Sequence, residues 1–181
     1  MNTADESQLV RRVSQGDQVA YRKLLDAHLP AVTRYVQRML TRPGDTEDIV
    51  QEVFLRLWTQ AAGFDQSKAR LSTWLHNIAH NLCIDLFRKQ KRIQLTDETG
   101  DSTGGEEPEV VLAATNRSAI VRNALSSLPE RQRSALILSY YQGLSNRETA
   151  DILELSLPAL ESLLARARRT LKQELQQEPE Q

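Results

Sequence analysis

Apolar residues recur at helical spacing along most of the chain, and no segment carries a convincing strand pattern. The clearest apolar stripe lies near the C-terminus and consists of Leu160, Leu163, Leu164, Ala167 and Leu171. Residues three and four apart share one face of a helix, so this spacing predicts a long amphipathic helix. A shorter helical segment precedes it, and only the turn Glu154–Leu155 and Ser156 stand between the two.

Capping signals mark where both of these helices begin. Ser145 and Glu148 match the capping box Ser-x-x-Glu, in which two side chains satisfy main-chain N–H groups. Ser156 can cap the longer helix, and Pro158 falls in its first turn, where a missing N–H is tolerated. A short capped helix before a longer one with a small, basic outer face is typical of a DNA-binding helix-turn-helix. An ordinary helical hairpin in a bundle has the same pattern.

Further helices are predicted in the N-terminal half of the chain, separated by Gly16-Asp17, by residues 42–45 and by Gly63. Pro30 is expected to kink or restart the second of them. The last begins near Leu71 and ends in a basic run of Arg88, Lys89, Lys91 and Arg92.

The composition changes after this basic run. Residues 94–114 are largely acidic and rich in Gly, Ser and Thr, and such a segment cannot bury enough apolar surface to fold alone. We therefore predict an all-α protein of two small helical domains, residues 5–93 and 115–175, joined by a flexible acidic linker over 94–114. The C-terminal domain is predicted to be a helix-turn-helix.

Composition narrows the class of protein further. The chain has 181 residues, a net charge of −1 and 5% aromatic residues, which suits small helical domains better than a sandwich or barrel. Near-neutral charge argues against a protein that coats DNA alone, but not against basic residues gathered on particular faces. The single cysteine, Cys83, rules out an internal disulfide framework and fits a reducing compartment. The chain shows neither a secretory signal nor a run of about 18 apolar residues, so we expect a cytoplasmic protein without membrane insertion.

The predicted helix around residues 48–58 has two distinct faces. The core face carries Ile49, Val50, Val53, Phe54, Leu57 and Trp58. The opposite face carries Asp48, Gln51, Glu52 and Leu55. This second face is either an ordinary solvated surface with one tolerated apolar residue, or an acidic docking surface whose apolar anchor meets a partner helix.

The helix that begins near Leu71 combines an aromatic residue, an amide and cations on one face, formed by Trp74, Asn81, Asp85 and Arg88. Such a face suits an unpaired base and its phosphates. Alternatively, Trp74 belongs partly to the core and the basic run complements the helix dipole.

The sequence gives only a weak signal for a metal site and none for a catalytic site. His76, His80 and Cys83 share a narrow sector of the same helix, but they match no common zinc spacing. We expect histidines that flank solvent beside a small buried thiol, with no bound metal. The chain has no glycine-rich phosphate loop and no catalytic motif, so we expect neither an enzyme nor a cofactor.

Four segments in order resemble the extracytoplasmic-function (ECF) group of bacterial RNA polymerase sigma factors. They are GDQVAYRKLLDAH, DIVQEVFLRLW, STWLHNIAHNLCIDLFRKQKR, and the helix-turn-helix segment from LPERQRSALIL through GLSNRETADIL to RARRTL. The resemblance implies a factor that binds core RNA polymerase and directs initiation at promoter DNA, in a stress or envelope response. It also implies control by an anti-sigma factor and no homo-oligomer. The alternative is a stand-alone helix-turn-helix regulator with a helical sensor domain.

The resemblance also assigns roles to individual residues. Those implied to bind a coiled coil of the polymerase's largest subunit are Asp48, Gln51, Glu52 and Leu55. Asn81 matches the position where a loop or helix break captures a flipped base of the minus-ten element, aided by Trp74, Asp85, Arg88, Lys89 and Arg92. The resemblance implies that Ser162, Ala165 and Arg166 face the minus-thirty-five element and that Arg147, Arg168 and Arg169 lie near phosphates. Glu161 belongs to the same DNA-binding set.

The chain departs from the family pattern in its recognition helix. The family commonly reads Gly-Thr-Val-Lys-Ser-Arg, whereas this chain has Glu161 in place of the cation and Leu163 in place of the arginine. Glutamate can accept from a cytosine amino group but repels phosphates, so we expect a different upstream element. Leu155 is taken to replace the glycine often found in the turn.

Overall fold

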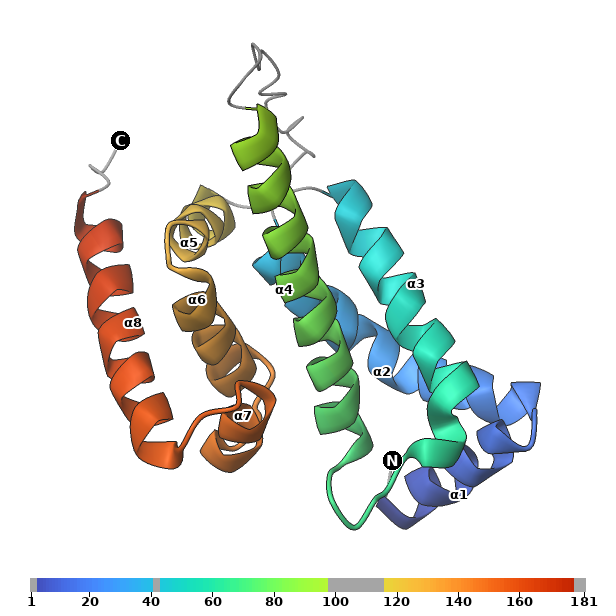
Figure 1. Cartoon of the computed structure of the whole chain (residues 1–181). Coiled ribbons are helices and arrows are strands. Elements are labelled where there is room, and N and C mark those ends of the chain that lie inside the picture. Colours follow the sequence, from blue (N-terminus) through green and yellow to red (C-terminus); the bar gives the residue numbers. More distant parts are fainter. Residues whose placement is uncertain (1–2, 41–42, 98–115, 178–181) are drawn as a thin grey trace.

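The computed structural model describes residues 3–40, 43–97 and 116–177, in which all regular structure is helical (Figure 1). The N-terminal domain comprises α1 (Thr3–Ser14), α2 (Gln18–Met39), α3 (Pro43–Gln60), the 3₁₀ turn η1 (Ala61–Gly63) and α4 (Leu71–Asp97). The C-terminal domain comprises α5 (Asn116–Ser126), α6 (Glu130–Leu136), the π-helical segment η2 (Ile137–Tyr141), α7 (Asn146–Ile152) and α8 (Leu157–Gln177). The prediction of an all-α protein is confirmed.

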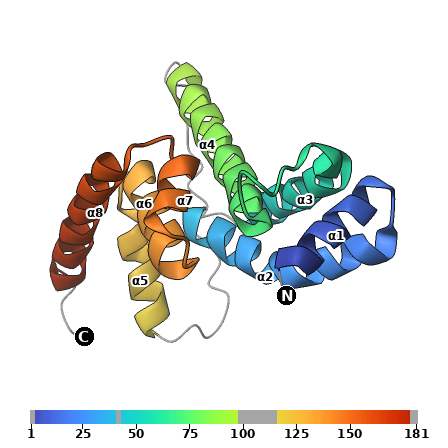
Figure 2. The same ribbon diagram turned by 90° about the horizontal axis from the view of Figure 1, so that it is seen from below.

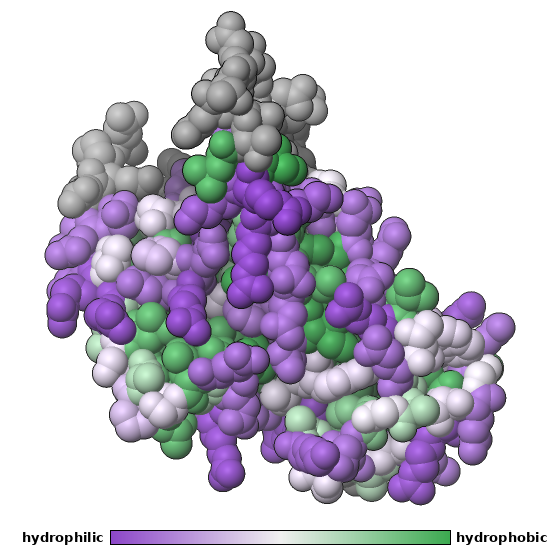
Figure 3. All heavy atoms as spheres, viewed as in Figure 1, coloured by the Kyte–Doolittle hydropathy of each residue, from purple (hydrophilic) through white to green (hydrophobic). Residues whose placement is uncertain are grey.

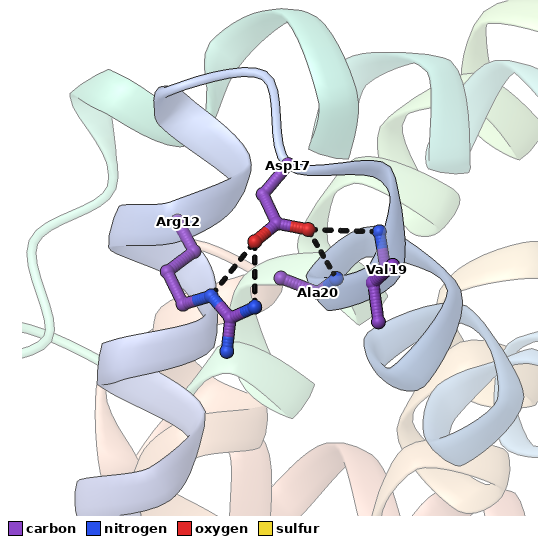
Figure 4. A network of polar contacts seen from close by, with 4 residues as sticks. All are labelled: Arg12, Asp17, Val19 and Ala20. Carbon is purple, nitrogen blue, oxygen red and sulfur yellow. Dashed lines mark hydrogen bonds and ion pairs between the residues drawn. The ribbon is translucent and has the colours of Figure 1, made fainter.

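Asp17 fixes the start of α2 against the end of α1 (Figure 4). Its carboxylate accepts hydrogen bonds from the N–H groups of Val19 and Ala20 at 2.9 and 3.0 Å. It also pairs with the guanidinium of Arg12 at 2.6 Å. The hydrogen bond from Ala20, helped by Arg12, lowers the pKa of Asp17. One carboxylate therefore satisfies free N–H groups of α2 and anchors the last turn of α1.

Two helix boundaries differ from those predicted. Helix α2 runs unbroken through Pro30, so the chain does not restart a helix there. Helix α4 continues to Asp97, past the predicted domain boundary at residue 93. Extending an existing helix adds one hydrogen bond per residue, so a polar segment can continue a helix that it could not begin. The rest of the predicted linker, residues 98–114, lies outside the described residues.

Each domain buries the apolar faces of its own helices. In the N-terminal domain, α2 packs against α1, α3 and α4, and its core includes Leu24, Tyr35, Leu57 and Leu75. In the C-terminal domain, α8 packs against α5, α6 and α7, and its core includes Leu138, Leu160 and Ala167. Burying one such leucine side chain stabilises the fold by about 2 kcal/mol.

The two domains also pack against each other and form one continuous core. Helix α2 contacts α5, α6 and η2, and α4 contacts α7. In Figures 1 and 2 the C-terminal domain lies alongside α2 and α4, with α8 on the side away from them. None of the helices in the described part of the chain has the length and apolar character needed to cross a membrane.

The histidines of α4 are buried at this domain boundary, so the prediction that they flank solvent is wrong. His76 Nδ1 donates to the main-chain oxygen of Ser72 at 2.7 Å, and His80 Nδ1 lies 3.0 Å from the hydroxyl of Tyr35. Burial lowers the pKa of both imidazoles, that of His80 to about 4. Packing with the C-terminal domain, which lies far away in sequence, covers a helix that would otherwise face water.

Candidate nucleic-acid and partner-binding surfaces

The outward face of α3 is exposed as predicted. Asp48, Gln51 and Leu55 are exposed, and Glu52 is half-buried. Leu55 keeps 53% of its surface in water, although Phe54 and Leu57 on the other face are buried. Glu52 accepts a hydrogen bond from Arg56 at 2.8 Å, so part of its charge is already paired. The surface therefore offers one apolar side chain within a weakly acidic rim.

The outward face of α4 carries the amide and the charged residues predicted for it. Asn81, Asp85, Arg88, Lys89 and Arg92 are all exposed. Figure 3 shows hydrophilic side chains along the front of this helix. Asn81 lies inside an unbroken helix and donates to Asn77 Oδ1 at 3.2 Å, so the loop or helix break expected at Asn81 is absent. The expectation of a break at this position is wrong.

Trp74 differs from its neighbours on α4 because it is half-buried. Its ring packs on that of Phe64, with 5.4 Å between the ring centroids. Phe64 belongs to the loop that separates η1 from α4. The interpretation that Trp74 belongs partly to the core is therefore confirmed, and stacking of a base on its accessible surface stays a prediction.

The loop of residues 64–70 is a feature that the sequence analysis missed. Asp65 shapes it by accepting hydrogen bonds from Ser67 N and Oγ at 2.9 and 2.7 Å, and these bonds lower the pKa of Asp65. The Asp-x-Ser pattern is the local signal that could have revealed this turn. With α4, the loop forms one wall of a cleft of about 560 Å³, and α7 forms the other. Its cationic members are Lys68, Arg70 and Arg147.

The helix-turn-helix forms as predicted, with both capping devices in place. Ser145 N donates to Glu148 Oε2 at 2.9 Å, and Glu148 N donates to Ser145 Oγ at 3.3 Å. Burial would raise the pKa of Glu148, but hydrogen bonds from Ser145 and Thr73 outweigh it and lower that pKa. At the start of α8, Ala159 N donates to Ser156 Oγ at 3.3 Å.

Helix α8 separates its buried and exposed residues as the apolar stripe predicts. The exposed set is Glu161, Ser162, Ala165, Arg166, Arg168 and Arg169, and Arg147 on α7 is exposed as well. Leu163 is buried in the domain core. At this position the departure from the family pattern therefore places an apolar side chain in the core. Glu161, which stands where the family commonly has a cation, is exposed.

The turn between α7 and α8 has its left-handed residue at Glu154, with φ of 53°. Leu155 N donates to Ala150 O at 2.9 Å and Glu154 N donates to Asp151 O at 3.3 Å, which together make a Schellman cap. Leu155 packs against the core. The position that favours glycine is therefore Glu154, and its assignment to Leu155 was wrong by one residue.

Among the described residues, no three or more His, Cys, Asp or Glu side chains gather into a metal-binding group. Desolvation raises the pKa of the Cys83 thiol to about 12, and the imidazoles of His76 and His80 are engaged by Ser72 and Tyr35. These three side chains are parts of the packed interior.

Comparison with known proteins identifies the family. The sequence model of Sigma-70 region 2 matches residues 24–93, and that of Sigma-70, region 4 matches residues 118–171. The ECF RNA polymerase sigma factor SigK of Mycolicibacterium vanbaalenii is 30% identical over 176 residues, covering 94% of this chain and 89% of that protein. The chain belongs to the ECF RNA polymerase sigma factors. SigW of Bacillus subtilis, another ECF factor, is 29% identical over 92% of this chain and 94% of its own length.

Solved structures show the same fold. The sigma factor RpoE of Bartonella quintana, in complex with the anti-sigma factor NepR, matches with a TM-score of 0.74 and 24% identity, over 88% of this chain and 98% of that one. As an ECF sigma factor the protein directs transcription initiation, and the matches favour this function over that of a stand-alone regulator. The region 2 match spans α3 and most of α4, and the region 4 match spans α7 and most of α8.

Proposed function

We propose that this sigma factor uses three exposed surfaces together to recognise a promoter. The outward face of α3 binds core RNA polymerase, the outward face of α4 reads the minus-ten element, and α8 reads the minus-thirty-five element. The observation that carries the proposal is the separation of faces on these helices: the assigned side chains reach water wholly or in part, and apolar positions between them are buried. The buried positions include Val53 and Phe54 on α3, Ile78 and Cys83 on α4, and Leu163 and Leu164 on α8. The protein acts as a recruiter of polymerase, not as a catalyst, and works in the cytoplasm.

Polymerase docking rests on Leu55. An exposed leucine flanked by Asp48 and Gln51 supplies an apolar anchor with a polar rim, which suits a helical partner such as the coiled coil of the largest polymerase subunit. The acidic rim favours a basic partner surface. We therefore assign this face, with Glu52, to core polymerase.

The minus-ten contacts rest on the exposed amide and charges of α4. Asn81 can hydrogen-bond the edge of an unpaired base, and the half-buried Trp74 offers part of its ring for stacking. Asp85 and Arg88 lie 3.5 Å apart and orient each other, while Lys89 and Arg92 extend the positive charge toward the displaced strand.

The minus-thirty-five contacts rest on the exposed face of α8. Ser162, Ala165 and Arg166 can approach base edges, and Arg147, Arg168 and Arg169 supply phosphate contacts. Glu161 accepts hydrogen bonds and so selects a base with an exposed amino group, such as cytosine. This residue distinguishes the upstream element from that of the commoner family sequence.

An anti-sigma factor is the proposed regulator, in a stress or envelope response. The RpoE structure was solved with the anti-sigma factor NepR, and its fold is that of this chain. A protein that covers the α3 or α8 surface would prevent polymerase or promoter binding.

The experiment is run-off transcription with core RNA polymerase and a promoter library. We expect start sites that depend on the added protein. Leu55→Asp should lower transcript yield at least ten-fold, because it places a charge at the apolar anchor. Val19→Asp is the matched control, since Val19 is an apolar residue of α2 with 63% of its surface exposed. If no start site depends on the protein, or if both variants lose activity equally, the proposed function is wrong.

A further inference from the structure

The first residue of α8 is an exposed leucine that contributes little to the core. Leu157 keeps 45% of its surface in water, whereas Leu160 and Leu164 in the following turns are buried. Helix α8 begins at Leu157 and lies on the side of the C-terminal domain away from α2 and α4 (Figure 1). The next residue, Pro158, is exposed as well. The start of this helix therefore presents an apolar edge to water.

The same turn has few main-chain N–H groups to offer to a phosphate. Pro158 has no N–H group, and Ala159 N donates to Ser156 Oγ at 3.3 Å. Leu160 N donates to Ser156 O at 2.9 Å. At most the N–H of Leu157 is left, although the start of a helix usually offers several such donors to an anion. The apolar edge is therefore the main feature that this end of α8 can bring to DNA.

Leu157 shares one side of α8 with two residues of the set proposed to bind the minus-thirty-five element. Glu161 follows it by four residues and Ala165 by eight, and both are exposed. Residues four apart are neighbours on the surface of a helix. The N-terminal residues of a recognition helix contact base edges in the major groove. Leu157 therefore stands at the end of α8 that meets the bases.

Thymine is the base that suits such a side chain. Its 5-methyl group is the apolar group that distinguishes it in the major groove, where the other bases present hydrogen-bond donors and acceptors. Leucine has neither a donor nor an acceptor, so it gains no hydrogen bond from those polar edges. Contact between the leucine and the methyl group removes apolar surface of both from water. The chemistry of this side chain therefore selects thymine.

We propose that Leu157 is a specificity-determining residue that reads a thymine of the upstream element by contact with its methyl group. This inference rests on the proposed function and adds an apolar contact to the polar ones of α8. Leu157 and Glu161 are about 6 Å apart along the helix axis, because a helix rises about 1.5 Å per residue. That distance is about two base-pair steps of about 3.4 Å each. The thymine should therefore lie within about two base pairs of the base that Glu161 reads.

The test removes the methyl group from the DNA and the leucine from the protein. Each thymine of the upstream element selected in the run-off assay is replaced in turn by deoxyuridine, which lacks only the 5-methyl group. Initiation is measured with core RNA polymerase and the full-length protein, at concentrations where promoter binding is limiting. One replacement should lower initiation about four-fold, because one apolar carbon is no longer removed from water. In Leu157→Asn, which keeps the size of the side chain but not its apolar character, the same replacement should have no effect.

Two further variants separate methyl reading from a general loss of activity. Leu175→Asn makes the same exchange in the last turn of α8, at a leucine with 39% of its surface exposed, and it should keep the deoxyuridine effect. Leu157→Met keeps an apolar side chain of similar volume and should keep the effect as well. Loss of the effect in Leu157→Asn alone would therefore assign the methyl contact to the apolar side chain of Leu157.

The inference is overturned if the selected element has no thymine near the base read by Glu161, or if no deoxyuridine replacement lowers initiation. It is also overturned if Leu157→Asn keeps the deoxyuridine effect, or if Leu175→Asn loses it equally. In each of these cases start sites that depend on the protein would leave the proposed function standing. The absence of any such start site would instead overturn the proposed function itself, so the two hypotheses fail on different measurements.

Discussion

The guanidinium of Arg133 donates a hydrogen bond of 2.7 Å to the main-chain oxygen of Met39, which is the last residue of α2. The same group donates to the oxygens of Ser126 and Leu128 at 3.3 Å within its own domain. The last carbonyl groups of a helix lack partners and carry partial negative charge, so a cation there is favourable. A single buried side chain thus ties the end of α2 to the C-terminal domain.

Replacing this side chain should destabilise the protein strongly. Arg133→Met leaves three main-chain oxygens without their donor, so we expect the free energy of unfolding to fall by about 3 kcal/mol. Urea denaturation followed by circular dichroism measures it. Arg131→Met is the control, because Arg131 is exposed, and it should change stability by less than about 0.5 kcal/mol. Equal effects of the two substitutions would contradict the structural role given to Arg133.

The left-handed conformation of Glu154 predicts a stabilising substitution. Glu154→Gly removes the clash of a side chain at φ of 53°, and we expect a gain of about 0.5–1 kcal/mol in the free energy of unfolding. Leu155→Gly should instead lower it, by about 2 kcal/mol, because that side chain packs on the core. Thermal unfolding of both variants distinguishes the two positions. If Leu155→Gly proved more stable than Glu154→Gly, the position that favours glycine would be Leu155.

Buried His80 predicts loss of stability in mild acid. Its pKa is about 4 in the folded protein and near 6.5 when unfolded, so the unfolded chain binds the proton first. Above pH 6.5 the imidazole is neutral in both states and costs no stability. As the pH falls below 6.5 the free energy of unfolding decreases, and the loss reaches about 3 kcal/mol at pH 4. His80→Gln, which keeps a polar partner for Tyr35, should flatten the dependence between pH 6.5 and 5. Urea titrations across that range measure it, and an unchanged slope would contradict the prediction.

The exposed acid on α8 predicts a change in promoter choice. Glu161→Lys removes the acceptor proposed to read an amino group and adds a cation, so the preferred upstream element should change. Binding should also weaken more steeply with salt. Selection from a randomised upstream element in the run-off assay reads out the preference. Gln173→Lys also places a cation at an exposed position of α8, with a smaller change in net charge because Gln173 is neutral, and it should leave the preferred sequence unaltered. An unaltered element in Glu161→Lys would rule out base reading by Glu161.

Local pattern alone determined much of this protein. The spacing of apolar residues predicted the helices, and it separated Leu160 and Leu164 from Ser162 and Arg166 on α8. The capping contacts of Ser145 and Ser156 are equally local, since each caps a main-chain N–H three residues later. The order of the motifs predicted the family, which the comparisons confirm. Such features depend on neighbours in sequence, and neighbours in sequence are visible without a structure.

Only the tertiary structure decided which polar residues are buried. His76 and His80 looked like solvent-flanking residues, and nothing near Arg133 in sequence indicates that its partner is Met39. The loop of residues 64–70 became a cleft wall only because α7 lies opposite. Each of these environments is made by segments far apart in the chain. The spacing of residues along a helix predicts which face is apolar, but only the packing of the two domains determines what covers that face.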